Sequence, residues 1–128
     1  MLDLDFFKKI NDNHGHDVGD LTLQEIAGIM NTAVHGYDDA RIGRWGGEEF
    51  FILLPGVDEA KAMTFAEHLR RAVDCHIFPH IGHLTISQGV ITVNGNSDLD
   101  RKAIYKAVDD ALYRSKEGGR NTIRKAVL

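Results

Sequence analysis

Apolar and polar positions along the chain follow two periods, and these predict an alternation of helices and strands. A spacing of three to four residues predicts helices, and alternation or a short apolar run predicts strands. The predicted helices cover residues 5–13, 19–35, 58–75 and 100–117. The predicted strands cover residues 2–5, 39–45, 48–54, 83–93 and 122–128. Residues 14–20 are predicted to form a loop and residues 94–98 a turn, and Asp5 is placed near the N-cap of the first helix.

The order of these elements predicts the fold class. Helices between strands favour parallel pairing, whereas Gly46-Gly47 between two apolar runs predicts a tight antiparallel hairpin. Both kinds of pairing together give a mixed β-sheet with helices packed on it, which is an α+β fold.

Composition limits the class of protein. The chain has 128 residues, of which 43% are apolar and 27% charged, and this fits one globular domain. A net charge of -4 argues against nucleic acid as a partner, because a phosphate backbone requires a basic face. A single cysteine, Cys75, rules out an internal disulfide framework and favours a cytoplasmic location. Apolar runs are far shorter than the roughly 20 residues of a membrane span, so no membrane segment is expected.

Four carboxylates form the first candidate site. Asp3 and Asp5 alternate along one strand and therefore share a side, while Glu48 and Glu49 directly follow the glycine pair. If the first strand lies beside the hairpin, one hairpin carboxylate can meet Asp3. Repulsion between these acids would be relieved by Mg²⁺, which prefers oxygen ligands and phosphate, and two such ions suit nucleotidyl transfer. The alternative is that these acids are solvated residues at strand ends.

Cations and an amide–acid pair form two further candidates. Lys8, Lys116 and Arg120 could bind phosphate, although cations at a helix C-terminus are also ordinary partners of the helix dipole. Asn11 and Asp20 could read guanine, since a carboxylate can accept hydrogen bonds from its N1–H and 2-amino groups. Asp20 could equally be a first-turn helix acid. The histidines His14, His16, His76, His80 and His83 lack a zinc-site spacing and are expected to be solvated loop residues.

Four motifs in order, "DLDFFKKINDNHGHDVGD", "RWGGEEF", "LTISQGV" and "DDALYRSKEGGRN", resemble the GGDEF domain of diguanylate cyclases in its GGEEF version. The resemblance covers about residues 2–123. It implies a palm-like fold with a protruding Gly-Gly hairpin, and condensation of two GTP into cyclic di-GMP with release of pyrophosphate. It also implies a face-to-face homodimer in which each domain holds one GTP.

The resemblance also implies roles for individual residues. The expected ligands of two Mg²⁺ or Mn²⁺ ions are Asp3, the Leu4 carbonyl, Glu48 and Glu49. Glu48 would be the base for the ribose 3′-hydroxyl, with Glu49 and Lys8 also catalytic. The expected substrate-binding residues are Phe6, Phe7, Lys8, Gly46, Gly47, Lys116 and Arg120 for the phosphates, and Asn11 and Asp20 for guanine.

The sequence departs from the family pattern in places. The window of the inhibitory R-x-x-D motif, residues 37–40, reads "YDDA", so product inhibition through that motif is not expected. Gln88 stands where an apolar residue is frequent. The family also has an upstream helix and a fuller first strand, so we expect residues 1–128 to be a shortened GGDEF domain that normally follows a sensor or receiver domain. Two other functions stay open: a non-catalytic nucleotide-binding module, and a cyclase with another product, against which Asp20 argues.

Overall fold

The computed structural model describes residues 1–95 and 100–128, and its elements follow the predicted order. The helices and strands are β1 (Leu2–Leu4), α1 (Phe7–His14), α2 (His16–Ala33), β2 (Arg41–Gly46), β3 (Glu49–Leu53), α3 (Glu59–Cys75), β4 (Ile86–Val90), α4 (Arg101–Glu117) and β5 (Ile123–Lys125). Of the turn predicted over residues 94–98, residues 96–98 lie outside the described part of the chain.

The five strands form one mixed sheet in the order β2-β3-β1-β4-β5. The short strand β1 is central and antiparallel to both of its neighbours, β3 and β4. The β2–β3 hairpin is antiparallel and β4 pairs with β5 in parallel, so the prediction of mixed pairing is confirmed. All three residues of this central strand are buried.

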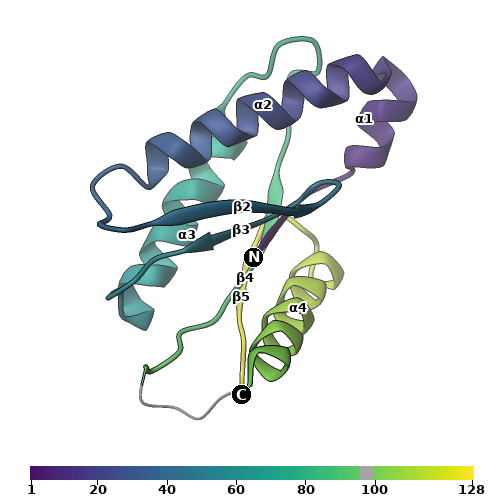
Figure 1. Ribbon diagram of the computed structural model, residues 1–128. Coiled ribbons are helices and arrows are strands. Elements are labelled where there is room, and N and C mark those ends of the chain that lie inside the picture. Colours follow the sequence, from purple (N-terminus) through teal and green to yellow (C-terminus); the bar gives the residue numbers. More distant parts are fainter. Residues whose placement is uncertain (96–99) are drawn as a thin grey trace.

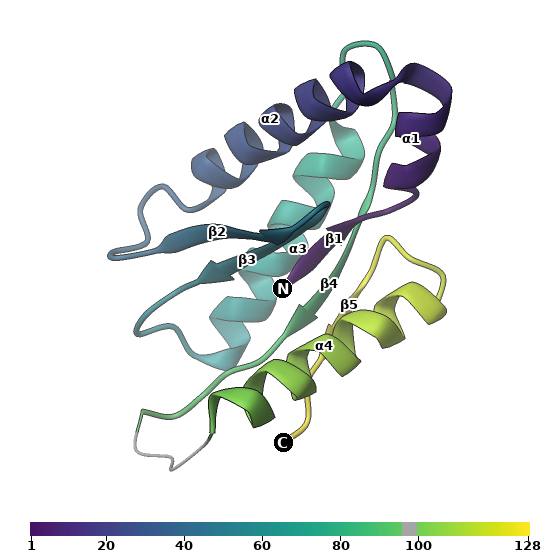
Figure 2. The same ribbon diagram turned by 45° about the vertical axis from the view of Figure 1, so that its right-hand side comes forward.

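The helices cover the two faces of the sheet unequally, as Figures 1 and 2 show. Helices α2 and α3 pack on one face, where the main core includes Leu4, Ile26, Met30 and Leu69. Helix α4 lies on the other face, against β4 and β5. A hollow of about 790 Å³ is lined by residues of the hairpin, α3, β4 and α4. Two of its lining residues, Trp45 of the hairpin and Tyr105 of α4, stack on one another.

The first two helices differ from the prediction. Helix α2 begins at His16, so the loop predicted over residues 14–20 is wrong and the break between the helices is essentially Gly15. Gly15 has a φ of 86°, which glycine adopts without a steric penalty. Its amide donates to the Asn11 carbonyl at 2.8 Å and its carbonyl accepts from the Gly19 amide at 3.1 Å, so one residue ends α1 and starts α2. The polar residues from His16 to Asp20 are therefore helical.

Asp5 lies next to the N-cap of the first helix, as predicted, but its carboxylate does not cap the helix. The N-cap of α1 is Phe6, at a φ of 57° and without a side-chain capping bond. Asp5 is instead buried and hydrogen-bonded to β4 and to the corner between α4 and β5. In the described part of the chain, no helix is long and apolar enough to cross a membrane.

Candidate active site

Three corners of the chain meet at one end of the sheet. They are the tip of the β2–β3 hairpin, the junction of β1 with α1, and the corner between α4 and β5 (Figures 1 and 2). In the antiparallel register of β1 with β3, Asp3 lies opposite Glu49, and the Leu4 amide donates to the Glu48 carbonyl at 3.3 Å. The expectation that the first strand lies beside the hairpin and brings Asp3 close to its acids is therefore confirmed.

Asp3 is a buried acid at this end of the sheet, with one cation and two further acids near it. Its side chain is only 6% exposed, and burial raises the pKa of Asp3 from 3.8 to about 6. The Lys116 ammonium forms an ion pair with the Asp3 carboxylate and opposes that rise, whereas the nearby Glu48 and Glu49 carboxylates add to it. The site therefore holds more negative charge than its own cation neutralises, and a further cation would be stabilising.

The raised pKa of Asp3 predicts an unusual dependence of stability on pH. The folded chain binds the Asp3 proton more tightly than the unfolded chain does. Stability is therefore lost as the pH rises from about 4 to about 6, instead of being gained. An Asp3→Asn variant has no carboxyl proton at this position and therefore does not lose stability in this way. The free energy of unfolding of the variant minus that of the original should increase by up to about 3 kcal/mol as the pH rises from about 4 to about 7.

Urea unfolding at several pH values, without divalent metal ions, measures this difference. Any effect of the substitution that does not depend on pH cancels in the comparison across pH. The ion pair with Lys116 forms only when Asp3 is ionised, and its contribution is already contained in the pKa of Asp3. A difference that stays constant from pH 4 to pH 7 would show that burial does not shift Asp3.

The residues at this end of the sheet fit a hard divalent cation by their chemistry. Within residues 1–95 and 100–128, no group of three or more His, Cys, Asp or Glu side chains is already gathered as a metal cluster. Mg²⁺ is usually held by one or two carboxylates, with water and substrate phosphate completing its shell. A buried carboxylate that already attracts a cation, with two more carboxylates beside it, matches that requirement. The arrangement therefore suits a metal that arrives with a phosphate ligand.

The glycine turn leaves open space beside the acids. Gly47 has a φ of 53°, and a Cβ atom added to either Gly46 or Gly47 would meet nothing within 4 Å. Arg44 fixes the turn from one side, since its Nε donates to the Gly47 carbonyl at 2.7 Å. A bulky ligand group can therefore approach the backbone closely here.

The start of α1 is the second wall of this space. The Phe6 side chain is 53% exposed, and the Lys8 side chain is also exposed. Phe7 differs from its neighbours, because its side chain is 7% exposed and belongs to the main core. Only the backbone of Phe7 can therefore serve a ligand. The first amides of a helix have no intrahelical acceptor and favour anions, which fits a phosphate at this point.

Asn11 and Asp20 lie on two helices that touch at this end of the molecule. A Cβ atom on Gly19 would lie 1.9 Å from Asn11 Oδ1, so the absence of a side chain on Gly19 leaves the room that the Asn11 amide occupies. Asp20 is the next residue on α2 and is exposed. Asn11 therefore packs against Gly19, the residue that precedes Asp20 on α2.

This contact predicts that Gly19→Ala weakens nucleotide binding without weakening the fold. The new methyl group would displace the Asn11 amide and weaken binding of a GTP analogue roughly 10-fold, about the worth of one good hydrogen bond. Helix stability should be unchanged or higher, because alanine favours a helix over glycine by up to about 1 kcal/mol. Gly28→Ala, on the same helix with nothing within 4 Å, is the matched control. Calorimetric titration and thermal melting test this, and equal affinity in both variants would contradict it.

The two cations of the last helix and corner occupy different positions. Lys116 pairs with Asp3, whereas the Arg120 guanidinium lies 4.5 Å from the centre of the Phe6 ring. Lys9 approaches the same ring, with its Nζ 4.8 Å from the centre. Arg120 therefore stands near the start of α1, where the sequence predicts phosphate binding.

Two contributors to the site, Arg44 and Lys9, were not identified from the sequence. Asp5 was placed among the candidate acids, but its hydrogen-bonding role was not predicted. Asp5 accepts hydrogen bonds at 2.6 Å from both the Thr85 and the Ser87 hydroxyl groups. The sequence gives only a partial signal: Thr85 and Ser87 are two residues apart in the strand predicted over residues 83–93 and so point to the same face, but nothing in the sequence pairs them with Asp5. Arg44 and Lys9 carry no comparable signal.

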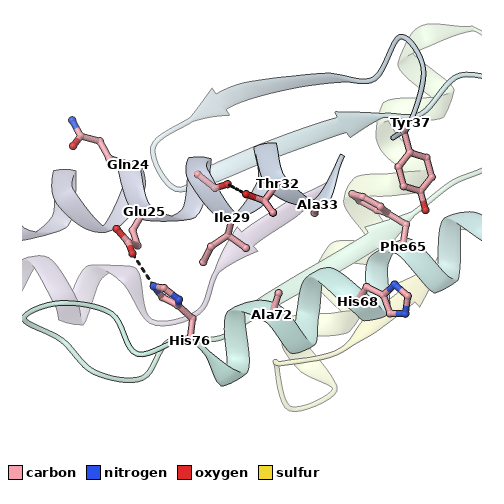
Figure 3. A pocket seen from close by; sticks show the side chains of 11 residues that line it. Gln24, Glu25, Ile29, Thr32, Ala33, Tyr37, Phe65, His68, Ala72 and His76 are labelled. Carbon is pink, nitrogen blue, oxygen red and sulfur yellow. Dashed lines mark hydrogen bonds and ion pairs between the residues drawn. The ribbon is translucent and has the colours of Figure 1, made fainter. Parts of the chain in front are cut away.

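A second hollow lies away from this site, between α2 and α3, with a volume of about 660 Å³. Figure 3 shows Glu25 and His76 meeting across it, with their side-chain atoms 2.8 Å apart, and Tyr37 and Phe65 at its other end. The rings of Tyr37 and Phe65 pack edge to face at 5.3 Å. None of the site residues predicted from the sequence lines this hollow.

Comparisons with known proteins agree with the geometry. Residues 1–122 match the family model described as "Diguanylate cyclase, GGDEF domain". Diguanylate cyclase A of Treponema denticola is 41% identical over 127 residues, which cover 96% of this chain and 33% of that protein. The active GGEEF domain of a diguanylate cyclase from Vibrio cholerae superimposes with a TM-score of 0.89 at 35% identity, over 99% of this chain and 80% of that chain. SiaD of Pseudomonas aeruginosa, solved with its activator SiaC, gives a TM-score of 0.88 at 34% identity, over 98% of this chain and 48% of that chain.

These similarities extend over nearly the whole chain, which spans about a third of the length of the curated relative. The solved structures share with this chain the palm-like α+β fold that the motifs predict, and one of them is a domain with the same GGEEF signature. The chain belongs to the GGDEF family of diguanylate cyclase domains.

Proposed function

We propose that this chain is the catalytic domain of a diguanylate cyclase, which condenses two GTP molecules into cyclic di-GMP and releases two pyrophosphates. The observation that carries the proposal is the buried Asp3 carboxylate, in register with Glu49 and beside Glu48 at the glycine turn. A buried carboxylate with two partly exposed carboxylates near it is costly, first through desolvation and then through repulsion, and binding a metal–phosphate complex is the function that offsets this cost.

GTP would bind along the three corners described above. Its guanine would lie against Asn11 and Asp20, where the Asp20 carboxylate accepts from the two donors of guanine and disfavours adenine. Its triphosphate would lie over Gly46 and Gly47 and reach the start of α1, near Lys8. The open space beside both glycines and the exposed Phe6 support this placement.

Asp3, the Leu4 carbonyl, Glu48 and Glu49 would hold Mg²⁺ or Mn²⁺, two ions per site. When bound, the ions would neutralise phosphate charge and make the ribose 3′-hydroxyl more acidic. Asp3 would give up part of its contact with Lys116, whose ammonium then becomes available to phosphate oxygens. The existing ion pair supports this assignment, because it shows that a cation is stable at Asp3.

The chemistry requires two domains that face one another. Glu48 would accept the proton of the 3′-hydroxyl, and the resulting oxygen would attack the α-phosphorus of the GTP held by the partner domain. The bond from that phosphorus to pyrophosphate breaks, and Lys8, Lys116 and Arg120 would stabilise the leaving charge. The same transfer in the opposite direction closes the ring, which accounts for two phosphodiester bonds and two pyrophosphates.

We also propose the cellular setting implied by this reaction. The domain would act in the cytoplasm, where GTP is available, under a sensor or receiver domain that brings two copies together. Residues 37–40, "YDDA", lack the R-x-x-D pattern, so we propose that cyclic di-GMP does not inhibit through that window.

An assay with GTP and Mg²⁺ at several protein concentrations tests the proposed function. We expect cyclic di-GMP and pyrophosphate in a ratio of one to two, at a rate that grows faster than linearly with protein concentration while dimers are scarce. Tight binding of GTP without product would instead support the non-catalytic module. A different cyclic nucleotide would contradict the proposed assembly of two GTP molecules across a dimer.

A further inference from the structure

A buried carboxylate beside the candidate active site has a role that the proposed reaction does not use. Asp5 is 4% exposed, and its Oδ1 accepts from the Ser87 hydroxyl at 2.6 Å. Its Oδ2 accepts from the Thr85 hydroxyl at 2.6 Å and from the Asn121 backbone amide at 3.0 Å. These bonds connect the end of β1 to β4 and to the corner between α4 and β5. Both oxygens have protein donors, so Asp5 is suited to holding that corner.

The corner held by Asp5 has an unusual backbone. Gly119, Arg120 and Asn121 have successive φ values of 108°, 62° and 45°. Such left-handed conformations are unfavourable for arginine, and a strained backbone persists only where surrounding contacts impose it. The Arg120 amide donates to the Ser115 carbonyl at 3.0 Å, which ties the corner back to α4.

The side chain of Asn121 supplies the remaining restraint. Its Oδ1 accepts from Arg70 Nη1 at 3.1 Å, and its Nδ2 donates to Asp74 Oδ2 at 3.3 Å, so both ends of the amide are bound to α3. Arg70 is itself fixed by two hydrogen bonds to Glu67, at 2.9 and 2.7 Å. Asn121 is thus attached to Asp5 through its backbone and to α3 through its side chain.

We propose that Asn121 is a positioning residue that holds Arg120 against Phe6, at the place where the nucleotide phosphates bind. Arg120 is exposed and lies 4.5 Å from the Phe6 ring, while the residue that follows it is fixed on two sides. When the backbone of an arginine is already restrained, less conformational entropy is lost as its guanidinium group binds phosphate. This inference rests on the proposed GTP site and adds to it a residue that touches no substrate.

Binding of a non-reactive GTP analogue with Mg²⁺, measured by calorimetry, tests the proposal without requiring turnover. Asn121→Gly keeps a backbone compatible with the observed φ and removes only the side chain. We expect it to weaken binding of the analogue roughly 5-fold. Arg70→Ala, which removes one partner of Asn121, should weaken binding to a similar degree. Arg71→Ala is the matched control, because Arg71 also binds Glu67, at 3.0 Å, without a bond to Asn121.

A double-variant cycle separates positioning from a general structural effect. If Asn121 acts through Arg120, then Asn121→Gly should have no further effect on binding in an Arg120→Ala background. Equal weakening in both backgrounds, or full affinity in Asn121→Gly alone, would overturn the proposal. If Arg120→Ala itself binds the analogue normally, the phosphate role of Arg120 fails and the positioning role fails with it. Binding of the analogue without any cyclic di-GMP from GTP would contradict only the proposed catalysis.

Discussion

Replacing Glu48 by glutamine is expected to lower cyclic di-GMP formation by at least about 1,000-fold while leaving the domain folded. The amide keeps the size of the side chain and removes its charge. It can therefore neither accept the proton of the 3′-hydroxyl nor balance a divalent cation. Stability should not fall, because Glu48 raises the pKa of Asp3 by repulsion and its neutralisation relieves that repulsion.

Product formation from GTP and thermal melting, measured on the same samples, test this expectation. Glu59→Gln is the matched control, since Glu59 is an exposed acid on α3 whose carboxylate pairs with Lys125. Turnover by Glu48→Gln within 10-fold of the original would remove Glu48 from the roles of base and metal ligand. Loss of turnover together with a large loss of thermal stability would show a structural role instead.

Replacing Gly89 by alanine is expected to give the largest loss of stability, about 3 kcal/mol, equivalent to a fall in Tm of about 10 °C. Gly89 is buried in β4 directly beneath α4. A Cβ atom there would lie 2.6 Å from the Val108 carbonyl oxygen and 2.7 Å from the Leu112 amide nitrogen. Both are backbone atoms of a helix and cannot rotate away, so α4 must shift from the sheet.

The control for Gly89→Ala is Gly28→Ala, because the same change there meets open space. Chemical unfolding of both variants measures the difference. A shift of α4 would also move Lys116, at its C-terminal end, away from Asp3, so nucleotide binding should weaken as well. A Gly89→Ala variant as stable as the original would show that α4 does not pack on β4 as closely as described.

The sequence was sufficient to predict the order of the elements and the mixed sheet. Helical spacing marked the long helices, and the glycine pair marked the hairpin, because both signals are local and depend on few neighbours. The limits of the elements were less predictable. Residues 83–93 were expected to be a strand, yet β4 covers only Ile86–Val90, since pairing with β1 and β5 decides where it begins and ends.

The sequence predicted which kinds of residue gather at the candidate site. It predicted less well which of them contact one another. Asp3 and the hairpin acids come from distant parts of the sequence and lie near one another, as expected from the pairing of the first strand with the hairpin. The ion pair between Lys116 and Asp3 was not predicted. The hydrogen bonds of Asp5 could not be read from the sequence in the same way. Its partners are 80 to 116 residues away in the sequence. A carboxylate at a strand end can either cap the next helix or form hydrogen bonds to distant strands. The sequence does not distinguish these two roles, because the choice depends on tertiary packing.

The central claim is that Asp3 and the acids of the glycine turn hold divalent ions that bind the phosphates of GTP. Crystals grown with Mn²⁺ and a non-reactive GTP analogue test it most directly, because anomalous scattering locates the manganese. We predict manganese bonded to carboxylate oxygens of Asp3 and Glu48 and to phosphate oxygens, at the short distances of about 2 Å typical of small hard cations. Nucleotide bound elsewhere, or manganese remote from Asp3 while Lys116 keeps its ion pair, would contradict the account.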